Sequence, residues 1–308
     1  MGKNDGVARL AAEGNEQTFL TPTLRTNLLK LSINKAFAFY QDFFGTSDTV
    51  PNLDSLADEY EKQRRNAQSL GLFKKGGIRE KDHLNLWCLG RVLLPTLYVE
   101  SGVFIGSSLH AFLRTPTLPN IVAIDPDLTK LKIPSEDLPA ETKLIDNQDF
   151  SQVSLPPLPE ASLVYFDDHI NSASRIIQSH EKGLRYLLFD DSTGWEGVCQ
   201  RLYPAVPTVP MIMNWEALSV NDKVSWTWEK PTDLNTGLIE TIKTRIWPSK
   251  SKWTRVTLTI DETFVEECKR ANRLVKKFTK IVDLGEYIPQ TLPEKMVDTT
   301  KYLVELHR

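Results

Sequence analysis

Two pairs of carboxylates stand where apolar, strand-like segments end. Asp167 and Asp168 close one such segment, and Asp190 and Asp191 close the next. The carboxyl ends of adjacent parallel strands meet at the edge of a sheet where ligands bind. Carboxylates gathered at one edge repel one another at pH 7 unless a cation neutralises them, and hard oxygen ligands suit Mg²⁺, Ca²⁺ or Mn²⁺. The pattern therefore indicates a divalent-metal site at this edge.

The first acidic pair is followed by His169, the one histidine beside these acids. A histidine next to carboxylates can be tuned to act as a general base near neutral pH, and Asp168 is the second candidate for that role. Two structural alternatives stay open. Asp168 could cap a helix that starts near Asn171, and His169 could face solvent on that helix.

A glycine-containing turn lies earlier in the chain, in the stretch Glu100-Ser-Gly102-Val-Phe-Ile-Gly106-Ser-Ser108. Glycines at the end of a strand let the backbone turn tightly and approach a ligand, and a following helix offers free N–H groups. The Gly-x-x-x-Gly spacing differs from the Gly-x-Gly-x-x-Gly of dinucleotide sites, which disfavours NAD. Asp125 follows at about 20 residues, the distance at which nucleotide-binding sheets place an acid for ribose hydroxyls. The alternative is a glycine turn needed only for packing, with Asp125 as a helix cap.

These motifs resemble those of the class I S-adenosylmethionine (SAM)-dependent methyltransferases over residues 80–195, in the stretches 100–108 and 123–127. The resemblance implies SAM as the cofactor. It implies that Glu100 and Gly102 contact the methionine part, that Asp125 holds the ribose, and that Asp149 lies near the adenine, with Asp146 competing for that place. Gly106 and Ser108, in the same loop, are also assigned to the cofactor site.

The acidic pairs resemble those of the metal-dependent O-methyltransferases of the caffeoyl-CoA and macrocin types, which implies that Asp167, Asp190 and Asp191 bind Mg²⁺ or another divalent cation. Asp168-His169 also resembles the Asp-His of a subgroup that includes the cephalosporin hydroxylases, so either Asp167 or Asp168 could be the ligand. The implied activity is O-methylation of a small molecule. The alternatives are a hydroxylase-like member of the same superfold and a catalytically inactive methyltransferase-like domain that binds a ligand or a partner.

The elements that must position these residues follow from hydrophobic periodicity. Segments that alternate between strand and helix imply βαβ units, and strands that are apolar throughout imply a sheet covered on both faces. We therefore expect an α/β fold, a Rossmann-like doubly wound, mostly parallel sheet with an antiparallel C-terminal hairpin and an N-terminal helical extension. The expected helices are 24–44, 53–69 and 80–93, and the expected strands are 97–101, 120–125, 141–146, 162–168 and 185–191, with a helix between the last two.

The pattern is weaker beyond Trp195. An irregular insert is expected near 203–231, followed by a hairpin of 240–247 with 254–260 and a helix over 262–278. The tryptophan-rich part of the insert is read as core rather than as a lid over a substrate. The expected domains are a helical extension at 1–80 and a Rossmann-like methyltransferase domain at 81–308.

Composition limits the class of partner. The chain has 308 residues, a net charge of −3 and a pI near 6.0, which disfavours nucleic-acid binding by bulk charge. Three widely spaced cysteines, Cys88, Cys199 and Cys268, form neither a disulfide framework nor a zinc spacing and read as reduced, buried thiols. The polar first residues have no signal-peptide pattern, and no apolar run is long enough to cross a membrane. We expect a soluble, cytoplasmic protein with a small-molecule substrate.

Overall fold

The computed structural model describes residues 22–46, 50–73, 77–115, 120–156, 161–190, 206–230, 252–284 and 301–307. The chain divides into two compact units. Unit 1 comprises Met1–Val99, Val103–Gln148 and Val282–Asp298, and unit 2 comprises Glu100–Gly102, Asp149–Ile281 and Thr299–Arg308. The domain boundary expected near residue 80 stays a prediction.

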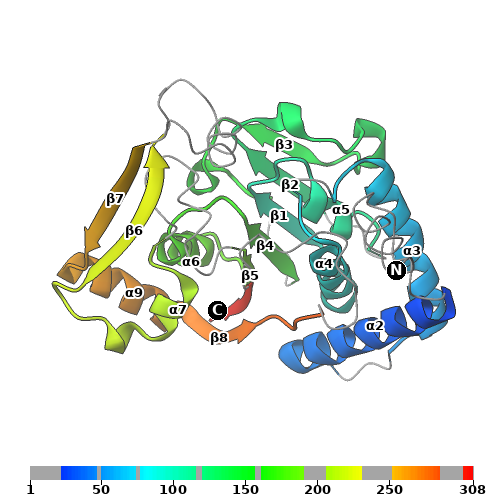
Figure 1. The fold of residues 1–308 in the computed structure, drawn as a ribbon, viewed down its shortest axis with the longest axis horizontal. Coiled ribbons are helices and arrows are strands. Elements are labelled where there is room, and N and C mark those ends of the chain that lie inside the picture. The colour runs from blue at the N-terminus through cyan, green and yellow to red at the C-terminus, as the bar shows by residue number, and fades with distance from the viewer. Residues whose placement is uncertain are drawn as a thin grey trace, which may run out of the picture. The chain divides into compact units, whose positions relative to one another are not determined.

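Three helices of unit 1 confirm the predicted helical segments: α2 (Pro22–Phe44), α3 (Leu53–Ser69) and α4 (Glu80–Leu93), drawn in blue and cyan in Figure 1. Apolar side chains at helical spacing bury one face of α2, including Leu29, Ile33 and Phe37, while Leu31 is 55% exposed. Asn52 caps α3 by accepting the backbone N–H groups of Asp54 and Ser55.

The seven-stranded sheet has the order β3-β2-β1-β4-β5-β9-β8. Pairing is parallel between β2 and β3 and between β4 and β5, and antiparallel where β9 pairs with β5 and with β8. This mostly parallel sheet with antiparallel last strands confirms the expected fold class. The strands are β1 (Leu97–Ser101), β2 (Asn120–Asp125), β3 (Lys143–Asp146), β4 (Ser162–Phe166), β5 (Tyr186–Phe189), β8 (Val275–Lys280) and β9 (Tyr302–Leu306).

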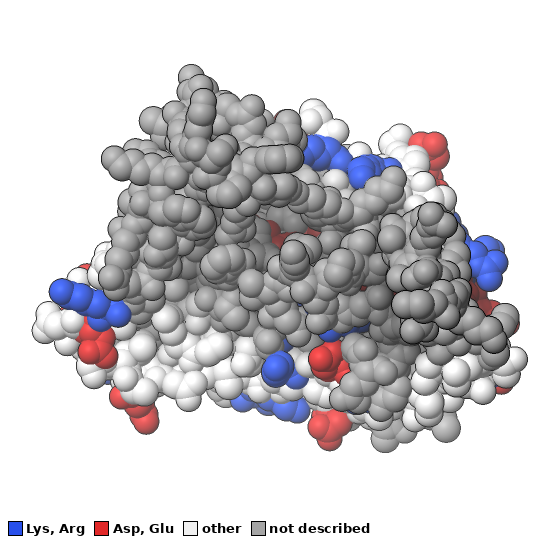
Figure 2. Space-filling view, in the orientation of Figure 1, with Lys and Arg blue, Asp and Glu red and all other residues white. Residues whose placement is uncertain are grey.

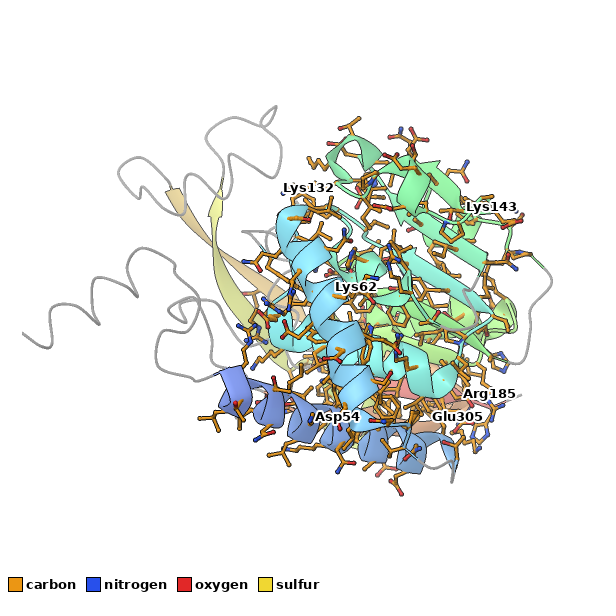
Figure 3. The ribbon with its side chains drawn as sticks, turned by 90° about the vertical axis from the view of Figure 1, so that its right-hand side faces the viewer. Asp54, Lys62, Lys132, Lys143, Arg185 and Glu305 are labelled. Atoms are coloured by element: carbon orange, nitrogen blue, oxygen red, sulfur yellow. The ribbon has the colours of Figure 1, made fainter. Side chains whose placement is uncertain are left out.

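The five strands predicted up to residue 191 are confirmed, whereas β8 and β9 were missed. The predicted helix over 262–278 ends instead at Leu274, because the next residues pair with β9 as strand β8. Arg185, just before β5, donates to Glu305 of β9, with Nη2 and Oε1 2.9 Å apart. Both residues are labelled in Figure 3.

The helices in the described part of unit 2 are α6 (Ser172–Glu181), α7 (Val209–Met213) and α9 (Glu262–Leu274). Asn171 caps α6 by accepting the N–H groups of Ala173 and Ser174, so the alternative in which Asp168 caps this helix is wrong. The apolar face predicted for this helix comprised Ile170, Ala173, Ile176 and Ile177. The last three are buried, whereas Ile170 precedes the helix and is 41% exposed.

A separate two-stranded sheet pairs β6 (Lys223–Lys230) with β7 (Lys252–Thr259), antiparallel. The predicted strand at 254–260 is confirmed as β7, which pairs with β6. Its expected partner, 240–247, lies outside the described residues and stays a prediction. The stretch 203–231 is not irregular throughout either. The alternation in Lys223–Lys230 forms a strand, although the prolines before it suggested a loop. Trp215 is half-buried, so it agrees only in part with the prediction that the tryptophans of this stretch pack in the core.

The short elements complete the description: α5 (Ser107–Phe112) and the 3₁₀ turns η1 (Leu128–Lys130), η2 (Ser135–Asp137), η3 (Phe150–Gln152) and η5 (Trp215–Ala217). Cys88 and Cys268 are buried free thiols as expected, and burial raises the pKa of Cys268 to about 12. Cys199 lies outside the described residues.

Over the part of the chain that the structure describes, no helix is both long enough and apolar enough to cross a bilayer. Among the described side chains of the face in Figure 2, acidic and basic groups are interspersed. That distribution agrees with the near-neutral charge balance of the sequence.

Candidate functional site

The loop between β1 and α5 contains the glycine motif, and its conformation depends on Gly106. This residue caps α5 with a φ of +87°, a region that L side chains rarely adopt. A Cβ placed there would lie 2.6 Å from Leu131 Cδ1 and 2.8 Å from Ile133 Cδ1. The turn and its packing therefore account for Gly106 without a ligand. The loop that packs on it is tied to the region after α3, where Lys132 Nζ donates to the Gly71 carbonyl at 3.2 Å (Figure 3).

Asp125 ends β2 and is held against this loop. Its side chain is buried, with 7% of the residue exposed. Oδ2 accepts the Phe104 N–H at 2.7 Å, and Oδ1 accepts the Asp127 N–H at 2.8 Å. Each carboxylate oxygen can accept a second hydrogen bond, so the group is fixed in place and still able to bind a hydroxyl donor. The helix-cap alternative does not hold for Asp125, because Asp127 caps η1 instead.

Two further residues assigned to the cofactor are enclosed by protein. Glu100 in β1 has no exposed surface, and Ser108 in the first turn of α5 is 3% exposed. The neighbouring Ser107 donates its hydroxyl to the Leu72 carbonyl at 2.7 Å. The roles of Glu100 and Ser108 toward a cofactor stay predictions.

Gly102, in unit 2, is required by a close approach of two backbones. Its φ is +95°, and a Cβ would lie 2.2 Å from the carbonyl oxygen of Asp167. The strands meet here, since the Asp167 N–H donates to the Ser101 carbonyl at 2.8 Å. The packing alternative therefore explains this glycine, because any side chain would push the end of β4 away from β1.

Asp168 lies in a buried charge cluster, which argues against its predicted role as a base. Its Oδ2 accepts the Ser101 hydroxyl at 2.6 Å and lies 2.8 Å from Arg175 Nη2. Arg175, with 2% of its side chain exposed, also binds Asp149 through two hydrogen bonds of 3.0 and 2.6 Å. Burial opposes the charge on Arg175, but the two carboxylates raise its pKa overall. The hydrogen bond from Arg175 holds the pKa of Asp149 well below its usual range.

Asp149 is therefore an ion-pair partner and the cap of η3, where its side chain accepts the Ser151 N–H at 2.9 Å. Its competitor for the adenine, Asp146, is exposed at the end of β3. The adenine role of Asp149 stays a prediction, and it would have to coexist with the Arg175 pair.

His169 stands before α6 rather than on it. Its backbone has a φ of +56°, and 15% of its side chain is exposed. Nε2 lies 4.0 Å from Asp167 Oδ1. The alternative of a solvent-facing histidine on the helix is therefore wrong: the structure brings His169 and Asp167 together in a mostly enclosed position.

Of the predicted metal ligands, the structure describes Asp167 and Asp190, and these two belong to no cation site among the described residues. Asp190 accepts the Tyr165 hydroxyl at 2.7 Å and is in direct contact with the ammonium of Lys301, which already balances its charge. Asp191 lies outside the described residues. Within the residues that the structure describes, no three His, Cys, Asp or Glu side chains are grouped so that they could hold a metal ion. In the described part of this sheet edge, Asp190 is therefore better explained as the partner of Lys301 than as a ligand of a divalent cation.

Sequence reasoning missed Arg175 and Lys301. Arg175 interrupts the apolar face of α6 beside Ile176 and Ile177, and a charged residue in that position is itself a signal of a buried partner. Lys301 precedes the apolar run 302–306, which was not recognised as a strand.

The comparisons with known proteins give no family. No family model matches the sequence, and no curated protein matches it. Among solved structures, the chain is similar to a putative O-methyltransferase from Klebsiella pneumoniae (12% identity, 73% of this chain and 96% of that chain, TM-score 0.37). It is also similar to the SAH-bound Podospora anserina methyltransferase PaMTH1 (11%, 99% and 97%, 0.40) and to cmcI with Mg-SAM (16%, 74% and 69%, 0.36). TM-scores this low carry no argument about this chain.

Proposed function

We propose that this protein is a SAM-dependent methyltransferase that acts on an oxygen of a small molecule. One observation carries the proposal: Asp125, at the carboxyl end of β2, is fixed by two backbone N–H groups, that of Phe104 in the loop after β1 and that of Asp127 just after β2. The strand order of the sheet reverses beside β1, and in open α/β sheets ligands bind at the carboxyl ends near such a reversal.

In this proposal the Asp125 carboxylate accepts the ribose hydroxyls of the cofactor. Backbone N–H groups hold both oxygens in place, so the acceptor is oriented before the ligand arrives. Glu100, Gly102, Gly106 and Ser108 would border the methionine part, although packing alone explains both glycines. Bound SAM supplies an electrophilic methyl group, and the work left to the chain is to orient the acceptor.

The base in this proposal is His169, which takes the proton of the acceptor hydroxyl. The supporting observation is its neighbour Asp167, with Nε2 and Oδ1 4.0 Å apart, because a carboxylate this close stabilises the imidazolium that forms. Asp168 is the weaker candidate, because Arg175 and Ser101 already engage its carboxylate. A cytoplasmic location is part of the same proposal.

A methyltransferase-like domain that binds its ligand without turnover is the second candidate. It is favoured by the engagement of Asp168 and Asp190 in ion pairs, which leaves His169 as the main base. Calorimetry with SAM and with its demethylated product SAH tests the ligand that both readings share. Binding of at least one of them is expected, and no heat from either at millimolar concentration would contradict SAM as the ligand.

The Asp125→Asn variant tests the ribose contact. Asparagine keeps the size of the side chain and one carbonyl oxygen but loses the charge, so charge-assisted bonds worth about 1.5–3 kcal/mol are weakened. The dissociation constant for SAM should rise by roughly one to two decades. The matched control is Asp137→Ala at an exposed position of unit 1, which should leave it unchanged. An Asp125→Asn protein that melts like wild type and binds SAM within twofold of wild type removes the assignment.

A further inference from the structure

A lysine and an acid of unit 2 meet inside the protein at the carboxyl end of β5. Lys301 Nζ contacts Asp190 Oδ1, and the same oxygen accepts the Tyr165 hydroxyl at 2.7 Å. The side chains of Lys301 and Asp190 are only 3% and 7% exposed. Water therefore contributes little to neutralising either charge, and each depends on the other.

The register of the sheet determines where the lysine lies. Lys301 directly precedes β9, and β9 runs antiparallel to β5 with Tyr302 paired to Phe189. The start of β9 therefore adjoins the end of β5, where Asp190 follows. The Lys301 carbonyl is fixed as well, because it accepts the Ile281 N–H at 3.1 Å. Figure 1 draws this C-terminal strand in red next to β5.

A cation bound at Oδ1 of Asp190 would have to displace this ammonium. Direct coordination by Mg²⁺ or Ca²⁺ needs a carboxylate oxygen in the first shell of the ion, and Lys301 Nζ and the Tyr165 hydroxyl already occupy that oxygen. A second positive charge beside the ammonium would also be repelled in a region of low dielectric.

We propose that Lys301 is the built-in counter-ion of Asp190 and stands where a divalent cation would otherwise bind. The acidic edge at β5 is then complete without metal. The inference concerns the charge balance of this edge and does not depend on SAM binding, so it can fail or hold whatever calorimetry with SAM shows.

The first test is thermal melting of the full chain with Mg²⁺, Mn²⁺ or Ca²⁺ at millimolar concentration and constant ionic strength, and again with chelator. A ligand that binds only the folded state raises the melting temperature by mass action. We expect no change for wild type with any of the ions. A rise that chelator reverses, and that Asp190→Asn abolishes, would overturn the proposal.

The second test removes the counter-ion. Lys301→Met keeps much of the apolar stem but leaves Asp190 buried without it, and the melting temperature should fall on the order of 10 °C. The double variant Lys301→Met, Asp190→Asn removes both charges and should recover at least half of that loss. The control is Lys276→Met, which removes a lysine from the pair with Glu305 at a 54% exposed position and should change the melting temperature little.

If Lys301→Met is poorly folded, the melting temperature of the double variant is compared directly with that of wild type and of Lys276→Met. That comparison still tests whether Lys301 neutralises Asp190. Recovery by the double variant supports the counter-ion role. A Lys301→Met protein that melts like Lys276→Met, or a double variant that is less stable than Lys301→Met, would show that Lys301 does not neutralise Asp190.

Discussion

The helical part of unit 1 and the strand ends of unit 2 bury polar side chains in different ways. In unit 1, α3, α4 and α5 share a chain of uncharged groups. His83 Nε2 lies 3.0 Å from His110 Nδ1, and His110 Nε2 lies 2.7 Å from Asn66 Oδ1. Trp87 Nε1 donates to Gln63 Oε1 at 2.9 Å. These contacts pair donors with acceptors without a formal charge, although His83 Nδ1 is left without a hydrogen-bond partner.

At the strand ends of unit 2, two clusters of enclosed polar groups are ionic. Arg175 binds Asp149 and Asp168, and Lys301 binds Asp190. The two regions therefore lose stability for different reasons. The neutral chain is destabilised when one of its groups gains a proton, and the ionic clusters are destabilised when a charged partner is removed. This difference also separates Asp125, whose carboxylate is held by backbone N–H groups, from acids that already have a cation.

The largest effect is expected from Arg175→Met. The substitution leaves Asp168 enclosed and Asp149 half-buried without their cation, and breaking a buried pair costs about 3–5 kcal/mol of the free energy of unfolding. Part of this loss is screened at Asp149, whose side chain is 38% exposed. Urea denaturation measures the change.

Arg270→Met is the matched control for Arg175→Met. Arg270 of α9 pairs with Glu181, which lies on α6 as Arg175 does. Both side chains are about 60% exposed, so the loss in free energy of unfolding should stay below about 0.5 kcal/mol. Equal losses in the two variants would erase the distinction between buried and surface ion pairs in unit 2.

Acidification should weaken the neutral chain of unit 1 next. Burial and the nearby His110 lower the pKa of His83 well below its ordinary value, and burial followed by the charge of Arg114 lowers that of His110 to about 4. Above the unfolded pKa of about 6.5 both states are neutral and nothing changes. As the pH falls from there toward 4, the unfolded chain binds protons first, so stability is lost, by about 2 kcal/mol per histidine at pH 5.

Urea melts of wild type and His110→Gln at pH 7.5 and pH 5.0 measure this effect, and the variant should lose less stability than wild type between the two. Asp149 does not contribute in this window. Arg175 lowers its pKa in the folded state, and the unfolded pKa of an aspartate, about 3.9, also lies below pH 5, so the group is ionised in both states. The same decline in both proteins would place the acid-sensitive groups elsewhere.

The smallest of these effects is expected from Gln63→Met. Methionine fills a similar volume but leaves the Trp87 N–H without its acceptor. The His110 carbonyl loses its donor at 2.6 Å and keeps only the Leu113 N–H at 3.3 Å. A buried group left unsatisfied costs about 1–2 kcal/mol here. Gln68→Met, at an exposed position of the same helix, is the control in the same denaturation experiment. If the two variants are equally stable, the neutral chain contributes little.

The sequence predicts the parallel part of the fold well because its signals are local. Helices α2, α3 and α4 and the first five strands follow from apolar periodicity within each segment. Strands β8 and β9 were missed because their pairing is non-local: Leu187 pairs with Val304, and β8 begins directly after a helix. Nothing within Val275–Lys280 distinguishes it from a continuing helix.

The candidate site was predicted only in part, for a similar reason. The position of Asp125 at the end of β2 follows from the strand pattern. Its partners do not, since a carboxylate's role depends on what the fold brings against it. Asp168 and Asp190 look alike in sequence, yet one meets Arg175 and the other meets Lys301, residues far from them in the chain. The sequence therefore predicts that an acid lies at the end of a strand, but it does not predict which residue neutralises the charge of that acid.

The place of β9 has a consequence for synthesis on the ribosome. A growing chain folds from its N-terminal side, but β8 emerges before β9 and must reach the sheet through it, because β9 lies between β8 and β5. Until β9 pairs with β5, the edge of β5 is open to pairing with other strands, and Asp190 lacks the Lys301 ammonium that neutralises it. Closing this edge joins segments far apart in the chain, which makes it a slow step. A nascent chain stalled before residue 301 should therefore be the form that chaperones hold longest.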